Sequence, residues 1–191
     1  MTTQLDDWSR DLAARTTPRF RAAIEALLTG RPAAEIVGIG VYTDADAAAV
    51  VVAANTRDNL EARIEQTPAY PRYFRWSPGE WDLLSFEQLP GGADGLQPLS
   101  DEIERFAEAV EDGELGDAAT SDVREAAWRA MAAALAELRS EGFFDRWPDA
   151  VVVLDAMDAA ITNDQRRAWI RAVNTADDAR AHEEWLQQPS S

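Results

Sequence analysis

A run of apolar residues at positions 150–154, Ala-Val-Val-Val-Leu, limits the possible folds of this chain more than any other feature. Its valines are β-branched and favour extended backbone. Because the run has no polar alternation, both faces of the resulting strand must be covered. The pattern therefore predicts a buried strand in the centre of a sheet, with amphipathic helices supplying the covering layers.

Two other segments, at positions 36–42 and 50–54, are also rich in β-branched residues and predict strands. The link around Asp44-Ala45-Asp46 is too short for a crossover, so the pair should form an antiparallel hairpin with both aspartates in its turn. An aromatic segment at 72–76 predicts a fourth strand. We expect one globular α+β domain over residues 1–191, with a small, mostly antiparallel or mixed sheet of about four strands and about six packed helices.

Apolar residues at helical spacing predict the helices that cover this sheet. Near the N-terminus they indicate a short first helix, then a second that begins with Thr17 as N-cap and Pro18 in its first turn. Ser100 is predicted to cap a helix that runs to about residue 112. The longest helix is expected at 121–141, where Gly142 occupies the position of a left-handed C-terminal cap. Two further helices are expected at about 164–173 and 176–187.

Six of the 16 aromatic residues fall within positions 70–86. Ser77, Pro78 and Glu80 match a capping box there, which predicts the start of a helix. Such an aromatic cluster is most simply part of the core. The alternative is a hydrophobic cleft that serves an enzyme or a small-molecule sensor. The residues that would line this possible pocket are Asn55, Tyr73, Trp76 and Trp81. Asn55 and Thr56 also fit the N-cap of a following helix.

The chain carries 35 acidic residues against 18 basic ones, all arginine, for a formal net charge of −17. This excess repels nucleic-acid phosphates and anionic membrane surfaces, so we expect neither as a partner. It favours a basic protein partner through electrostatic steering, although solubility alone is the simpler explanation. No apolar run approaches the roughly 18–20 residues of a membrane span, and the acidic N-terminus lacks the features of a signal peptide. We therefore expect a cytoplasmic protein.

The densest acidic segment, residues 101–117, holds eight acids and one arginine. At the helical rotation of about 100° per residue, some of these carboxylates share one side of the predicted helix, opposite Ile103 and Phe106. They are Asp101, Glu104, Glu108, Glu111 and Asp112. Like charges at this spacing destabilise a helix slightly. The stripe is either a solvated face or a docking surface for a basic partner, whose association would then depend strongly on salt.

Few residues are available for catalysis or metal binding. Without cysteine there can be no zinc–thiolate site and no Cys–His pair, and the one histidine, His182, is predicted to face solvent on the last helix. Glycine-rich phosphate loops and a G-x-S-x-G elbow are absent from the sequence. Asp155, Asp158 and Asp164 follow the buried strand, but without such a loop they do not define a magnesium site. We predict no catalytic residue, metal or cofactor, while a carboxylate-only enzyme stays open because acids are abundant.

Short motifs spread over about residues 18–160 carry a resemblance to a known family. They are Phe20 with Ile24, Tyr42-Thr43-Asp44, Ala53-Ala54-Asn55-Thr56, Leu138-Arg139-Ser140-Glu141-Gly142-Phe143-Phe144 and, most specific, Tyr73-Phe74-Arg75-Trp76-Ser77-Pro78-Gly79-Glu80-Trp81. In their order along the chain, these motifs resemble those of the bacterial family called domain of unknown function 4303. The resemblance implies no activity and no catalytic residues. By analogy with small bacterial domains that accompany secreted toxins, we expect a non-catalytic, acidic protein-binding domain of immunity type that neutralises a basic toxin domain.

Overall fold

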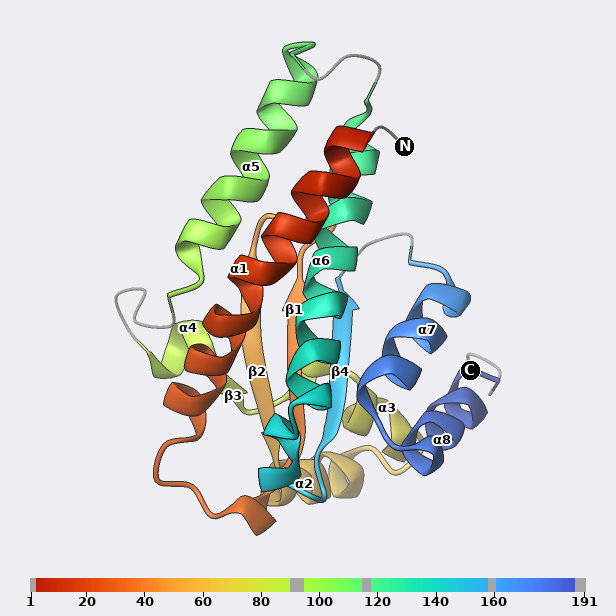
Figure 1. Cartoon of the computed structure of the whole chain (residues 1–191). Coiled ribbons are helices and arrows are strands. Elements are labelled where there is room, and N and C mark those ends of the chain that lie inside the picture. Colours follow the sequence, from red (N-terminus) through yellow and green to blue (C-terminus); the bar gives the residue numbers. More distant parts are fainter. Residues whose placement is uncertain (1–2, 90–94, 115–117, 158–160, 188–191) are drawn as a thin grey trace.

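A four-stranded mixed sheet with the order β3-β2-β1-β4 lies at the centre of the molecule (Figure 1). The computed structural model describes residues 3–89, 95–114, 118–157 and 161–187. β1 (Ile36–Thr43) and β2 (Val50–Thr56) pair antiparallel, which confirms the predicted hairpin. β3 (Leu83–Leu84) pairs antiparallel with β2, and β4 (Val151–Ala156) lies parallel to β1.

The turn between β1 and β2 is fixed by Asp44, as the sequence predicted. Its Oδ1 accepts hydrogen bonds from the backbone N–H groups of Ala48 (2.8 Å) and Ala49 (3.2 Å). Ala47 adopts a left-handed φ of 62° and is buried, so the turn folds back against the body of the protein. Asp46 remains exposed at its tip.

β4 is not the central strand that the apolar run at 150–154 predicted, because it forms one edge of the sheet. Both of its faces are nevertheless buried, and its open edge is occupied by a side chain. The amide of Asn174 accepts from the N–H of Val152 (2.7 Å) and donates to the carbonyl of the same residue (2.6 Å). The continuous apolar run therefore correctly indicated a strand with two covered faces. At the edge of that strand, the side chain of Asn174 makes the hydrogen bonds that a neighbouring strand would make.

Eight α-helices surround the sheet within the described residues, which together with the mixed sheet gives the expected α+β class. The helices are α1 (Thr3–Leu28), α2 (Arg57–Gln66), α3 (Pro71–Trp76), α4 (Ser85–Gln88), α5 (Gln97–Glu111), α6 (Thr120–Ser140), α7 (Asn163–Val173) and α8 (Ala176–Leu186). Three short 3-10 turns are η1 (Ala33–Glu35), η2 (Pro78–Glu80) and η4 (Phe143–Arg146). Gly142, with φ of 73°, ends α6 in the left-handed conformation that was predicted.

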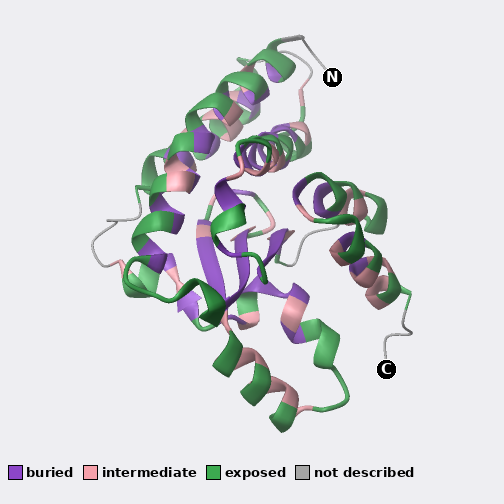
Figure 2. Ribbon diagram, turned by 60° about the horizontal axis from the view of Figure 1, so that its bottom comes forward, coloured by how far each residue is buried: buried purple, intermediate pink, exposed green. Residues whose placement is uncertain are grey.

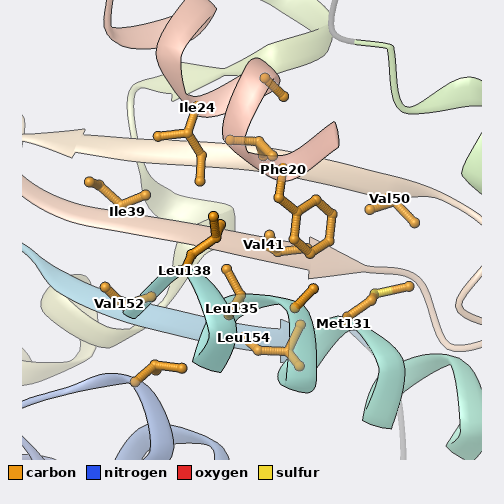
Figure 3. Packing of buried hydrophobic residues seen from close by; sticks show 14 of the residues in the cluster. Phe20, Ile24, Ile39, Val41, Val50, Met131, Leu135, Leu138, Val152 and Leu154 are labelled. Atoms are coloured by element: carbon orange, nitrogen blue, oxygen red, sulfur yellow. The ribbon is translucent and has the colours of Figure 1, made fainter. Parts of the chain in front are cut away.

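α1 and α6 cover the first face of the sheet. Figure 3 shows Phe20 and Ile24 of α1 and Leu135 of α6 packed over Ile39 of β1 and Val152 of β4. All five side chains are fully buried. At about 1.5–3 kcal/mol for each such side chain, this layer supplies a large part of the stability. Figure 2 shows the sheet buried and the outward sides of the helices exposed.

The opposite face of the sheet is covered by aromatic side chains and by the C-terminal helices. Trp81 lies against Gly38 and Gly40, where an added Cβ would stand 2.9 Å from the indole ring. Glycine is therefore required here for the close approach of Trp81 to the strand. Trp76 and Ile170 belong to the same buried cluster.

At one end of the molecule, α5 and the N-terminal parts of α1 and α6 extend beyond the sheet (Figure 1). These helices share a small core of their own, formed by Leu5, Val110, Val123 and Ala126. Trp8 of α1 stacks on Phe106 of α5, with ring centroids 4.2 Å apart and planes inclined by 13°. The projecting helices thus present the outer side of α5 to solvent.

The predicted break between two N-terminal helices is wrong, since α1 continues through Pro18. Thr17 is not an N-cap: its Oγ1 donates to the carbonyl of Ala13 (3.1 Å) and lies 2.6 Å from Oε2 of Glu137 on α6. Proline costs a helix one hydrogen bond. Packing of both halves of α1 along α6 outweighs that loss.

Three other local predictions were also wrong. Residues 72–76 form the helix α3 rather than a strand, with Pro71 at its N-terminus. Ser77 caps no α-helix, because the segment after it is only the 3-10 turn η2 and Ser77 makes no capping hydrogen bond. Ser100 lies inside α5, which begins at Gln97 with a proline in its first turn. A proline lies in the first turn of both α3 and α5, where its fixed φ is compatible with a helix start.

Candidate functional site

The predicted acidic stripe of α5 is exposed, and its carboxylates have no arginine partner among the described residues. Asp101, Glu104, Glu108, Glu111 and Asp112 are all exposed. Among the described residues none of these carboxylates forms an ion pair. The carboxylate of Asp101 accepts a hydrogen bond from the side-chain amide of Gln97 (2.7 Å). Glu102 lies on the inward side of the helix and pairs with Arg15 of α1. We call the five exposed carboxylates the acidic face.

A groove runs beside the acidic face, between α5, the start of α6 and the turn that joins β1 to β2. It has a volume of about 380 Å³. Its floor is apolar, and its acidic lining comes from α5 and from Asp46 of the turn. The lining residues are Asp46, Ala48, Ile103, Glu104, Ala107, Glu108, Glu111, Thr120, Val123 and Arg124. An apolar floor between carboxylate walls suits a partner whose side chains combine an aliphatic stem with a positive end.

Arg124, which lines the groove, and Arg105 of α5 do not pair with its carboxylates. Arg124 places its guanidinium 5.3 Å from the ring centroid of Trp128, and its Nε has no hydrogen-bond partner among the described residues. Arg105 donates from Nε to the backbone carbonyl of Asp101 (3.1 Å). Within the described residues fourteen of the 18 arginines form ion pairs, and only Arg15 among them pairs with a residue of α5, Glu102. The acidic face is therefore a part of the surface where five exposed carboxylates lie on one helix without an arginine partner among the described residues.

The residues of the possible aromatic pocket form a packed junction. Asn55, Trp76 and Trp81 are buried. The amide of Asn55 and the indole N–H of Trp81 both donate to the backbone carbonyl of Phe74, at 3.2 and 3.0 Å. Their polar groups hold α3 against the sheet, so they are not free to contact a ligand.

Tyr73, the fourth residue of that set, lies apart from the other three on the surface. It is 40% exposed, and its hydroxyl donates to Oε1 of Glu80 (3.3 Å). Partial burial and the nearby carboxylate of Glu80 raise the pKa of Tyr73 above 10.0. The structure thus brings Asn55 and Trp81 together at the backbone carbonyl of Phe74, places Trp76 in the same buried cluster as Trp81, and leaves Tyr73 outside.

Thr56 has the role that the sequence suggested, since its hydroxyl accepts from the N–H of Asn59 (3.2 Å) at the start of α2. The same hydroxyl donates to Oδ2 of Asp82 (2.7 Å), whose Oδ1 accepts from the N–H of Thr56 (2.9 Å). Asn59 in turn donates to Oδ1 of Asn55 (2.8 Å). These bonds tie β2, α2 and the segment before β3 into one polar network.

The prediction that His182 faces solvent is wrong. The side chain is 3% exposed and lies between Trp76 of α3 and Trp185 of α8, at centroid distances of 5.0 and 5.3 Å. Its Nδ1 is buried without a hydrogen-bond partner among the described residues. Burial, and secondarily the positive charge of Arg166, lower the pKa of His182 to about 4, so the ring is neutral at neutral pH. The spacing of Ala179, His182 and Trp185 on α8 was the sequence signal of this inward side.

A small cavity of about 10 Å³ lies beside His182, which is room for about one water molecule. It is lined by Trp76, Val153, Leu154, Asp155, Arg166, Ile170, His182 and Trp185. Asp155 accepts from Arg166 at 3.2 Å, which fixes both charged groups at the end of β4. Nothing larger than water fits without movement of a covering element.

The aspartates after β4 do not form a common cluster in the described structure. Asp155 pairs with Arg166, and Asp164 pairs with Arg167 at 2.8 Å; Asp158 lies outside the described residues. The described part of the chain contains no group of three or more histidine, aspartate or glutamate side chains that could hold a metal ion. Within that part, moreover, no helix combines the length and apolar character needed to cross a bilayer.

Comparison with known proteins identifies one family. The model of DUF4303, described as a domain of unknown function, matches residues 17–175. The match begins within α1 and ends immediately before α8. No curated protein and no solved structure matches the chain.

Proposed function

The chain belongs to the DUF4303 family, a domain of unknown function, and we propose that it is a non-catalytic, acidic protein-binding domain. Its docking surface is the acidic face of α5 together with the adjoining groove. The partner is a basic protein segment. The specific class that we propose is an immunity-type protein that neutralises a basic toxin domain by covering it.

One observation carries this proposal: exposed carboxylates are concentrated on α5 without arginine partners, while most arginines elsewhere are paired. Like charges gathered on one surface raise the local negative potential and speed the encounter with a positive partner. Glu104, Glu108 and Glu111 also line a groove with an apolar floor, so the face offers contact area as well as charge. Charge then sets the rate and the register of docking, and burial of the floor adds affinity.

The groove fits lysine or arginine side chains in particular. Their methylene stems can cover Ile103, Ala107 and Val123, while their charged ends reach the carboxylates of α5 and of Asp46. Arginine can in addition bind a carboxylate through two parallel hydrogen bonds. A partner helix or loop with basic side chains at regular spacing would satisfy both parts of the groove.

The test is capture of proteins from a lysate of the native host at low salt, followed by a wash at high salt. The bait is the unmodified chain, the variant Glu104→Gln/Glu108→Gln/Glu111→Gln, or a control variant with Asp58→Asn/Glu61→Gln/Glu65→Gln. The control removes the same charge from exposed carboxylates of α2, which has no described ion pair at these positions and lies at the other end of the molecule (Figure 1).

The proposal requires a basic protein that binds the unmodified chain and the α2 variant, is lost from the α5 variant, and is released by salt. It further requires that the captured protein is toxic when expressed alone and harmless when this chain is present. If all three baits retain the same partner, the acidic face is not the docking surface. Recovery of a metabolite without a protein would instead favour an enzyme or sensor.

A further inference from the structure

α8 is attached to the rest of the protein through a narrow apolar side. Only Ala179 and His182 of this helix are buried, with Ala181 and Trp185 partly covered. They pack on Trp76 of α3 and on Ile170 of α7. Removal of α8 would therefore expose an apolar groove between α3 and α7, along the second face of the sheet.

Arginines from both walls of this groove pair with acidic residues of α8. Nε of Arg171 on α7 donates to Glu183 at 2.8 Å. On the α3 side, Arg72 lies 3.3 Å from Glu184, and Arg75 lies 3.6 Å from Asp178. The body contributes the positive charges and α8 the negative ones, so the groove is complementary to an acidic amphipathic helix.

Two further observations distinguish α8 from the helices of the main core. His182 leaves its buried Nδ1 without a partner among the described residues, and a cavity of about 10 Å³ remains next to it. A buried nitrogen that makes no hydrogen bond to the protein adds no specific contact to the docking of the helix that carries it. In addition, the region that matches the family ends at residue 175, so α8 follows the shared part of the domain.

We propose that the arginine-walled groove between α3 and α7 is an interaction surface for an acidic amphipathic helix of a partner protein, and that α8 is the intramolecular helix that the partner displaces. The inference does not rest on the proposed function, because the two surfaces carry opposite charge. Tethering holds α8 at a high local concentration, so a displacing helix must bind better than α8. Occupation of the groove by α8 also keeps its apolar floor from non-specific contacts.

The first test is hydrogen exchange of the unmodified chain at neutral pH. If α8 detaches on its own, its amide hydrogens exchange at least about tenfold faster than those in the centre of α6, through an opening that is insensitive to low denaturant. If α8 exchanges only with global unfolding, at the rate of the α6 core, it is an integral part of the fold and the proposal fails.

The second test uses a full-length variant with Glu183→Arg/Glu184→Arg, which places like charges opposite Arg171 and Arg72. The probe is a fluorescent peptide of residues 175–187, with blocked ends, which keeps the N-cap Thr175 that accepts from the N–H of Asp178. A second peptide carries the same two reversals. The control protein is Glu61→Arg/Glu65→Arg, which makes an equal change in net charge at exposed positions of α2, outside the groove between α3 and α7.

We expect the natural peptide to bind the α8 variant saturably and the control protein at least about tenfold more weakly, because there the tethered α8 competes. The reversed peptide should not bind either protein. Failure of the natural peptide to bind the α8 variant would overturn the proposal. Equal binding of both peptides would do so as well, because the groove would then not select acidic helices.

Discussion

The acidic face of α5 and the interface of α8 use the same kind of residue in opposite ways. The five carboxylates of the acidic face have no arginine partner among the described residues, whereas Asp178, Glu183 and Glu184 of α8 each meet an arginine of the body. Both helices are acidic, yet only one of them leaves its charge available to another molecule. The difference lies in the neighbours that the fold supplies, and a net charge of −17 does not reveal it.

The surfaces beneath these helices differ as well. The C-terminal part of α5 rests on a small core formed with α1 and α6, whereas Leu99 and Ile103 nearer its start belong to the main core against the sheet. The groove that holds α8 is built on the sheet itself, through Trp76, Trp81 and the two glycines of β1. Disturbance of the second face should therefore reach α8 and leave the acidic face in place.

The largest expected effect comes from Gly40→Val, which places a side chain where Trp81 lies. A Cβ at this position would stand 2.9 Å from the indole and 3.0 Å from the carbonyl oxygen of Val153, so the strand or the ring must move. We expect a loss of about 2–3 kcal/mol in the free energy of unfolding, measured by denaturant titration. Gly79→Ala is the control, since its Cβ would meet only the sulfur of Met157 at 3.5 Å. Equal stability of the two variants would contradict the close packing of Trp81.

The next effect concerns the edge of the sheet beside α7. Asn174→Ala removes the hydrogen bonds to Val152 and to the carbonyl of Ile170. Because those backbone groups lie at a buried edge, the change should cost about 1–3 kcal/mol in the free energy of unfolding. Hydrogen exchange should show faster exchange in β4 and α8 but no change in α5. Faster exchange in α5 would mean that the two regions are coupled.

A third effect is a dependence of α8 docking on pH. The folded pKa of His182, about 4, is below the ordinary value of 6.5, so between these values the undocked histidine takes up a proton that the docked one does not. The stability of docking is complete above pH 6.5 and falls as the pH decreases, by up to about 2 kcal/mol at pH 5. Arg166 and Arg167 oppose protonation, while Glu183 favours it.

The measurement is hydrogen exchange of α8 between pH 5 and 7, corrected for the intrinsic rate. His182→Phe should abolish the dependence, because phenylalanine packs between Trp76 and Trp185 without a titrating group and can use part of the neighbouring cavity. A variant that keeps the full dependence would show that another group is responsible. α5, which contains no histidine, serves as the internal reference.

The smallest effect tests the comparison directly. Neutralisation of Glu104, Glu108 and Glu111 to glutamine should stabilise the protein by a few tenths of a kcal/mol at low salt, because it relieves repulsion between like charges. Neutralisation of Glu183 and Glu184 should destabilise it by about 0.5–1 kcal/mol, because it removes two ion pairs. Both differences should shrink at high salt in thermal unfolding. The same sign for both variants would remove the distinction between the helices.

The features that follow from local patterning were predictable from the sequence. The β-branched segments formed β1, β2 and β4, and the turn at Asp44 joined the first two antiparallel. The amphipathic pattern at 121–141 formed α6, with Gly142 at its end, but α6 is not the longest helix as predicted, because α1 has 26 residues and α6 has 21. The prediction of which side of α5 faces solvent was also correct, because the spacing of its charged residues and the spacing of its apolar residues indicated the same orientation.

The errors arose where distant contacts decided the outcome. The sequence pattern could not show that a side-chain amide, Asn174, would replace a strand beside β4. In the aromatic segment, α3 formed because its side chains pack against the sheet rather than alternating along a strand. His182 was placed outside because charged neighbours surround it, yet those charges are neutralised by arginines of α3 and α7. Ion pairs between residues far apart in the sequence cannot be recognised from the spacing of residues within one helix.

The projection of α5 beyond the sheet separates what the protein recognises from what keeps it folded. The acidic side chains on the outer surface of that helix are exposed, so they can be exchanged with little risk to folding. Related chains can therefore keep one scaffold and acquire different recognition surfaces on it. Diversification of binding preference should be concentrated on this helix, and the residues around Trp81 should change least.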